Sequence, residues 1–329
     1  MNRLKPFCSI ALLALALLMS APALLAQEQA PEVLAPAPAS APVRSTPSLE
    51  LDPALQRIID QDNQAQAQAD LWIREHQELN KEKPFQDDTL PLRIRDRLAS
   101  VEKAYEDYLF GHPESMEGRL AYASFLMDIG RDNDAAREWL RLKEKHPDSP
   151  VLLNNLGNYF AQKGEALEAF PYYEAAIAKA PQEPLYVKNL ASVVYIFREE
   201  AFTYYHLKPQ AALLLAQALY RKALLLAPDD FILRTALAQT WYYLSPFEPE
   251  KALADWKKAH ALAADDSERQ AVLLHYARVA ILAGDFEEAQ KQLEAVTFPQ
   301  HQELKETLLK NLDERRKLAE ASNPEAPTP

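Results

Sequence analysis

The sequence of 329 residues is poor in glycine and cysteine, with six and one respectively. No two glycines are close enough to form a glycine-rich phosphate loop, which excludes the dinucleotide-binding and P-loop fingerprints. The cysteine, Cys8, lies in a segment that we expect to be removed. The mature chain would then have no thiol for a disulfide, a zinc site or catalysis. Few glycines among many Ala, Leu, Glu and Gln residues favour helix throughout.

Positive charge is also in short supply. The sequence has 36 Lys and Arg residues against 48 Asp and Glu, which gives a formal charge of −12. Removing Arg3 and Lys5 with the leader would take the charge of −12 to −14. An acidic chain repels phosphate backbones, so nucleic acid is a poor candidate partner. The same charge argues against adsorption to an anionic membrane surface.

Residues 1–26 have the three parts of an export signal. Two basic residues make a short positive start, an apolar run covers residues 10–19, and small residues follow. A run of about ten residues is too short to cross a bilayer as a helix, which needs roughly twenty. We therefore expect a signal peptide cleaved after Ala26 or Ala23. The mature protein would be periplasmic or secreted, with no membrane insertion.

Residues 27–50 are rich in proline, alanine and serine. Such a composition cannot bury a core and favours extended, polyproline-like conformations. The segment is therefore predicted to be a linker between the export signal and the folded part. Residues 322–329 have a similar composition and are predicted to form a disordered tail.

From residue 115 onward the chain repeats itself with an offset of 34 residues. The matched pairs are Gly130/Gly164, Ala135/Ala169, Trp139/Tyr173 and Pro147/Pro181. The pattern is most complete over residues 150–183, in Leu153, Leu156, Gly157, Phe160, Gly164, Ala169, Tyr173, Ala176 and Pro181. In period and in these positions the chain resembles the tetratricopeptide repeat, a helix–turn–helix unit. The resemblance implies an all-α, right-handed α-solenoid.

Three packing positions recur in five successive units over residues 115–300. A small residue on the first helix is Ala123, Gly157, Ala191, Ala238 or Ala277. A small residue on the second helix is Ala135, Ala169, Ala216, Ala252 or Ala289. Its bulky companion is Trp139, Tyr173, Tyr220, Trp256 or Leu293. Small residues let two helix axes approach closely and bulky residues fill the space beside them, so all fifteen should be buried.

The third unit is longer than the others. Pro228 follows Pro181 at an offset of 47 residues instead of 34, with the extra length at 195–210. We expect this insertion to lengthen both helices by about two turns each, with a break at Leu207–Pro209 because proline disfavours helix in the residue before it. Residues 51–114 are interpreted as a degenerate leading repeat. Residues 301–321 are interpreted as the C-terminal capping helix that solenoids need.

The sequence shows no pattern typical of an active site. A His-Glu-x-x-His motif, a paired-carboxylate motif and a nucleophile elbow are all missing. His112 and His146 occupy the same position in successive units, which indicates a structural role. The acidic pairs at 229–230 and 265–266 fit helix caps between repeats. We therefore predict no catalytic residue, no metal site and no cofactor.

In the tetratricopeptide family the first helices line the concave face, which binds peptides or helices of other proteins. The resemblance places these residues there: Asn154, Asn155, Asn158, Lys188, Asn189, Ser192, Tyr195, Gln239, Tyr242 and Arg278. Asn155 and Asn189 recur one repeat apart and resemble an asparagine ladder, since an amide can donate and accept hydrogen bonds together. The alternative is that these side chains are only solvated helix residues.

Three functions fit this pattern. The first is an exported scaffold or adaptor that binds a protein or peptide partner in the groove. The second is a fixed structural subunit of an envelope or secretion assembly that docks through the extended third repeat, where aromatic residues concentrate as Tyr195, Phe197, Phe202, Tyr204 and Tyr205. The third, a helical envelope enzyme such as a polysaccharide lyase, would need acids that converge in one cleft, and their spacing indicates none.

Overall fold

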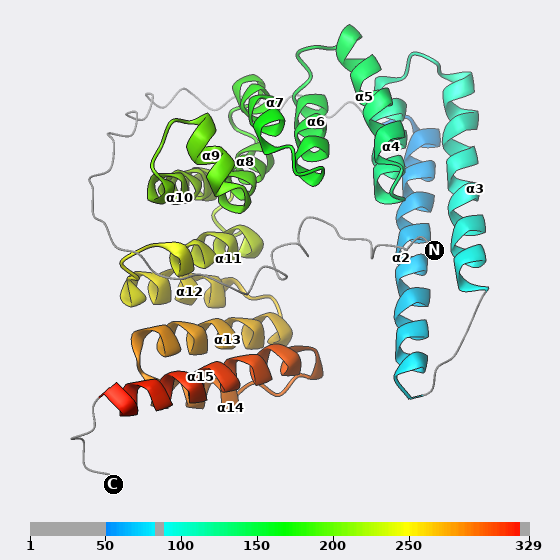
Figure 1. The fold of residues 1–329 in the computed structure, drawn as a ribbon. Coiled ribbons are helices and arrows are strands. Elements are labelled where there is room, and N and C mark those ends of the chain that lie inside the picture. Colours follow the sequence, from blue (N-terminus) through cyan, green and yellow to red (C-terminus); the bar gives the residue numbers. More distant parts are fainter. Residues whose placement is uncertain (1–50, 83–88, 323–329) are drawn as a thin grey trace. The chain divides into compact units, whose positions relative to one another are not determined.

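The computed structural model describes residues 51–82 and 89–322, which form helices without any strand (Figure 1). The predicted signal peptide and linker, and nearly all of the predicted tail, lie outside these residues. Within them the chain divides into two compact units, one up to Tyr159 and one from Phe160. The expectation of an all-α repeat fold is confirmed.

The first unit consists of successive antiparallel helices, most of which begin at capped or proline-marked positions. Asp52 caps the start of the first described helix, because its carboxylate accepts from the Ala54 amide at 2.8 Å. The Ser115 hydroxyl does the same for the Gly118 amide at 3.0 Å. The helices are α2 (Pro53–Glu82), α3 (Leu90–Gly111), α4 (Met116–Asp128), α5 (Asp132–Lys145) and α6 (Pro150–Gln162), whose last residues already belong to the second unit.

The second unit continues the alternation of first and second helices. Asp230 and Asp265 cap two of its first helices, each accepting from a backbone amide at 2.8 Å, as the acidic pairs predict. The elements are α7 (Ala166–Lys179), α8 (Pro184–Ile196), α9 (Arg198–Tyr204), α10 (Pro209–Leu226), α11 (Phe231–Gln239), the 3-10 turn η1 (Thr240–Tyr243), α12 (Pro249–Leu262), α13 (Asp266–Ala283), α14 (Phe286–Glu294), the 3-10 turn η2 (Pro299–His301) and α15 (Gln302–Ser322).

The fifteen predicted packing positions all lie in the core. Gly157 is buried, and each of the other fourteen side chains is at most 2% exposed. Between the two helices of a repeat, Gly130, Gly164 and Gly284 adopt φ of +79°, +78° and +81°. Glycine adopts this left-handed conformation at little cost in free energy, whereas a residue with a Cβ is strained in it. The glycine therefore permits the tight turn that brings the small positions of the two helices together.

The third repeat matches the expectation only in part, since its second helix, α10, has 18 residues against 14 in α5 and α7. Its first helix, α8, is not lengthened but ends at Ile196, and the inserted residues form the separate short helix α9. The backbone turns at Phe197, which has φ −103° and ψ 49°. The turn lets Tyr204 and Tyr205 pack on Phe170 at centroid distances of 5.1 and 5.5 Å instead of protruding. The break before α10 does lie where proline predicts it, since Lys208 is extended with ψ 156°.

Gly118, in α4, provides a test of packing in the first unit. A Cβ at this position would lie 2.7 Å from Cε1 of Tyr108. The Tyr108 ring cannot move easily, because its hydroxyl donates to Asp52 at 3.1 Å and its ring stacks on His112 at 4.3 Å. We expect Gly118→Ala to lower the free energy of unfolding by about 1–3 kcal/mol through overpacking.

Gly111 is the matched control, since a Cβ there meets no atom within 4 Å. Alanine has the higher helix propensity at both positions, so Gly111→Ala should be neutral or slightly stabilising. Chemical denaturation of both variants, followed by circular dichroism, compares them directly. Equal effects at the two positions would show that the contact with Tyr108 is not restrictive.

Candidate binding surface

The ten predicted groove residues are divided between the two units. Asn154, Asn155 and Asn158 lie on α6 in the first unit. The other seven belong to the second unit: Lys188, Asn189, Ser192 and Tyr195 on α8, Gln239 on α11, Tyr242 in η1 and Arg278 on α13. Asn154 is only 4% exposed, so the expectation of a surface side chain is wrong for this residue. It shares the core-facing side of α6 with Leu153, whereas the remaining nine are half-buried.

Ser192 has a structural partner. Its hydroxyl accepts a hydrogen bond of 3.0 Å from Tyr220. Tyr220 occupies a bulky packing position, and burial raises its pKa to about 12. A buried phenol needs such a partner. Ser192 therefore anchors the second helix of its own repeat, whatever else it contacts.

Five residues of the second unit make a cluster of tyrosine rings and guanidinium groups. The Arg278 guanidinium lies over the Tyr242 ring at 4.2 Å, and that of Arg198 lies over the Tyr243 ring at 5.2 Å. Tyr195 meets Tyr243 edge to face, with centroids 5.7 Å apart. We call these five residues the aromatic–arginine cluster. It joins α8, α9, η1 and α13 into one surface.

Sequence reasoning found three members of this cluster and missed Arg198 and Tyr243. Arg198 begins the inserted helix α9, which has no counterpart in the other repeats. Tyr243 ends a 3-10 turn, where the α-helical spacing used to assign faces no longer holds. The concentration of aromatic residues at 195–205 was the signal that this insertion differs, but not of which side chains would meet.

A stack of two rings supports Tyr242 of the cluster. The Trp256 and His275 rings lie parallel at 3.8 Å, and the Tyr242 hydroxyl is 3.1 Å from Nδ1 of His275. Burial, followed by the positive charge of Arg278, lowers the pKa of His275 to about 3. His275 is therefore neutral at ordinary pH. A fixed neutral ring holds Tyr242, which in turn orients Arg278.

Within residues 51–82 and 89–322, the two arginines of the cluster have no acidic partner. No carboxylate of the described residues lies within 4 Å of the guanidinium of Arg198 or Arg278. Both are nevertheless held in place by tyrosine rings, since a guanidinium above an aromatic face is attracted by the ring quadrupole. The arrangement therefore presents two oriented cations whose hydrogen-bond donors are available.

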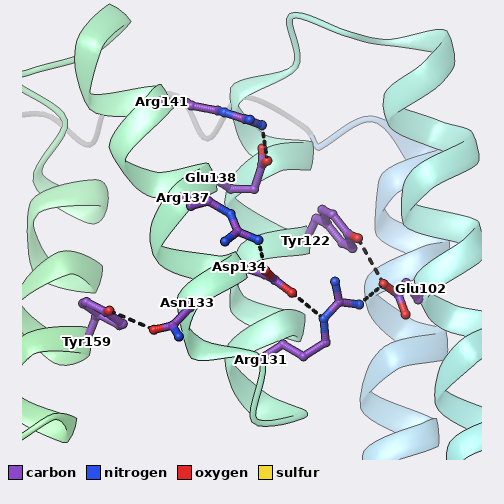
Figure 2. A network of polar contacts seen from close by, with 9 residues as sticks. All are labelled: Glu102, Tyr122, Arg131, Asn133, Asp134, Arg137, Glu138, Arg141 and Tyr159. Carbon is purple, nitrogen blue, oxygen red and sulfur yellow. Dashed lines mark hydrogen bonds and ion pairs between the residues drawn. The ribbon is translucent and has the colours of Figure 1, made fainter.

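Arginines of the first unit provide a contrast (Figure 2). Arg131 contacts Glu102 of α3 and, at 2.7 Å, Asp134 of α5. Arg119 of α4 pairs with Glu138 of α5 at 3.0 Å. These charges neutralise one another and link successive helices, which is a structural role. The guanidinium groups of Arg198 and Arg278 lie instead on tyrosine rings.

Residues 51–82 and 89–322 contain no group of three or more His, Cys, Asp or Glu residues arranged to hold a metal ion. Over the same ranges, every helix is too short or too polar to cross a membrane. The apolar run at 10–19 lies outside these ranges.

Comparisons place the fold among known structures. No family model and no curated protein matches the sequence. PilW, a type IV pilus biogenesis factor, is 17% identical with a TM-score of 0.52, over 75% of this chain and 98% of that chain. The APC/C hetero-tetramer Cut9–Hcn1 matches at 14% identity and a TM-score of 0.50, over 80% of this chain and 50% of that chain.

A third similar structure is TTC0263, a thermophilic TPR protein of Thermus thermophilus, at 19% identity and a TM-score of 0.45, over 60% of this chain and 99% of that chain. The likeness to PilW spans most of both chains. It agrees with the buried small and bulky positions and with the left-handed glycine between paired helices. The chain thus has the fold of the tetratricopeptide-repeat proteins, a helical solenoid.

Proposed function

We propose that the protein is an exported scaffold that binds a protein or peptide partner through the first helices of its repeats. The observation that carries this proposal is the aromatic–arginine cluster. Its side chains come from four neighbouring elements, stay partly exposed and are fixed by contacts with one another. A preformed surface rich in tyrosine and arginine is typical of the energetic centre of protein interfaces.

The similar structures support a binding role. PilW is described as a pilus biogenesis factor, and Cut9 is described in a hetero-tetramer with Hcn1. Scaffolds of this fold leave a long row of first helices open to a partner. In this chain Gln239 lies on α11, which is the first helix of the fourth repeat, and its side chain is half-buried.

Site-specific cross-linking tests the proposal. Cys8 is the only cysteine, so a thiol introduced elsewhere in the mature protein would be unique. A cross-linker attached to Gln239→Cys should capture a partner from an envelope fraction in stoichiometric amount. The same reagent on Leu225→Cys, at an exposed position of α10, should capture none. Equal capture at both positions would contradict binding through the first helices.

The alternative function, docking of a fixed subunit through the third repeat, predicts another result. Phe202 of α9 is 38% exposed, whereas Tyr204 and Tyr205 pack against the core. Most aromatic residues of the insertion are therefore used within the fold, which favours the first-helix surface. If the cross-linker captured a partner from Phe202→Cys but not from Gln239→Cys, the result would support the structural subunit instead.

Export is part of the proposal and makes its own prediction. Cleavage by signal peptidase at the small residues after the apolar run should leave a mature chain that begins at Gln27, or at Leu24. Mass spectrometry of the protein purified from its native cells measures this directly. A chain that still begins at Met1 would contradict export through a cleaved signal.

A further inference from the structure

We propose that the aromatic–arginine cluster binds the carboxylate of an aspartate or glutamate in a peptide segment of the partner. This inference rests on the proposed function and names the chemistry of the ligand. Arg198 and Arg278 together offer ten N–H donors to an acceptor, at five per guanidinium. No acceptor for them exists among the residues that the structure describes.

The two guanidinium groups of the cluster lie on the rings of adjacent residues. Tyr242 and Tyr243 are consecutive, and each carries one of the guanidinium groups on its ring. Tyr195 packs against Tyr243, and its hydroxyl has no hydrogen-bond partner in the described part of the chain. Burial raises the pKa of Tyr195, and the charges of both Arg278 and Arg198 oppose that rise. Both cations therefore lie within electrostatic range of this hydroxyl, which is a third donor of the cluster.

The ligand is an acid because only an acid compensates these charges. Arginine presents a planar fork that matches the two oxygens of a carboxylate, and such charge-assisted pairs are about twice as strong as neutral hydrogen bonds. The tyrosine rings hold both forks in place before binding, so little side-chain freedom is lost on binding.

Internal acids do not take this role. Glu199 and Glu200 follow Arg198 directly in α9, yet neither reaches a guanidinium of the cluster within 4 Å. Glu248, near the start of α12, pairs with Lys251 instead. A chain with 12 more acidic than basic charges has many possible partners for an arginine. The guanidinium groups of Arg198 and Arg278 lie on adjacent tyrosine rings and so keep their donors open to an acceptor from a partner.

A single carboxylate fits the surface better than a polyanion. The net charge of −12 repels nucleic acid over the whole chain. An acidic side chain within a peptide needs only the local positive field of the cluster, and the tyrosine rings offer apolar contact to its neighbours. Affinity should also decline with added salt, because the contact is charge-assisted and partly exposed.

A peptide selection tests the inference without knowledge of the partner. The full mature protein selects binders from a phage-displayed library of random peptides. We expect the enriched sequences to share an Asp or Glu, and its replacement by Asn or Gln to weaken binding about tenfold or more. The double variant Arg198→Gln/Arg278→Gln should lose a similar factor.

The matched control is Arg137→Gln/Arg141→Gln, which removes the same two charges from exposed positions of α5. It should bind like the wild type. A third variant, Arg198→Lys/Arg278→Lys, keeps the charges but loses the fork, and we expect intermediate affinity. If the glutamine variant folds poorly, the affinity of this lysine variant for the selected peptides decides the test.

Three outcomes would overturn the inference. They are enriched peptides without a shared acid, equal losses in the α5 control, and tighter binding of a fluorescent single-stranded oligonucleotide than of any peptide. The first two leave the proposed function standing if Gln239→Cys still captures a partner. Acid-dependent peptide binding combined with capture only at Phe202→Cys would support the carboxylate site and contradict the proposed function.

Discussion

Replacing Trp256 with alanine is expected to lower the free energy of unfolding by about 3–5 kcal/mol. Trp256 is 1% exposed and fills the bulky position of the fourth repeat. It stacks on His275 at 3.8 Å and packs with Ala238 and Ala252 in the core of the second unit. Its removal leaves a cavity that rigid helices on both sides cannot close. Since natural domains are stable by about 5–15 kcal/mol, the loss is a large share of the total.

Leu225→Ala in α10 is the control, because Leu225 is 84% exposed and its loss should change stability by at most about 0.5 kcal/mol. Repeats stabilise one another mainly through their neighbours. Hydrogen exchange should therefore show the loss of protection in α11, α12 and α13 and leave α3 and α4 unchanged. A uniform loss along the chain would mean that the two units unfold as one.

The regular part of the fold was predictable because its packing has a fixed period. In the first, second and fifth repeats a turn glycine, a small residue and a bulky residue recur at constant spacing, and each has one physical role. Trp139 and Tyr173, one repeat apart in the sequence, are both buried. Where three coupled rules hold together, a single sequence is sufficient to place the helices.

The insertion in the third repeat was not predictable in the same way. Its length was apparent, but a spacing rule says nothing about residues that have no counterpart in other repeats. Phe197 bends the backbone, and Tyr204 and Tyr205, at the end of α9 and just after it, fold back onto the core. The position of Arg198 in the binding surface depends on that bend. Tertiary packing, rather than helical propensity, decided the outcome here.

Face assignment was the weaker part of the site prediction. Helix periodicity distinguishes a core face from a solvent face, but adjacent residues on the border are ambiguous. Asn154 was expected on the surface and is buried, whereas its neighbour Asn155 is half-buried. Lys188 and Asn189 of α8 stay partly exposed, and their role in binding remains a proposal.

Acid is expected to destabilise the second unit through His275. The pKa of this histidine is lowered from 6.5 to about 3, first by burial and then by the charge of Arg278. The unfolded chain therefore binds a proton more readily than the folded chain as the pH falls below 6.5. Stability should decrease from about pH 6.5 toward pH 3. Since the ring is not fully enclosed, we expect a loss of about 2 kcal/mol between pH 6.5 and pH 4.5.

His275→Phe isolates this contribution. Phenylalanine keeps the stack on Trp256 but has no proton to bind, and all other groups titrate in both proteins alike. The difference in unfolding free energy between wild type and variant, measured by denaturation at several pH values, should change by about 2 kcal/mol over this range. Parallel curves would show that His275 accepts a proton in the folded state. In that case the His275 ring would carry a positive charge next to Tyr242. The idea that a neutral ring supports the aromatic–arginine cluster would then be wrong.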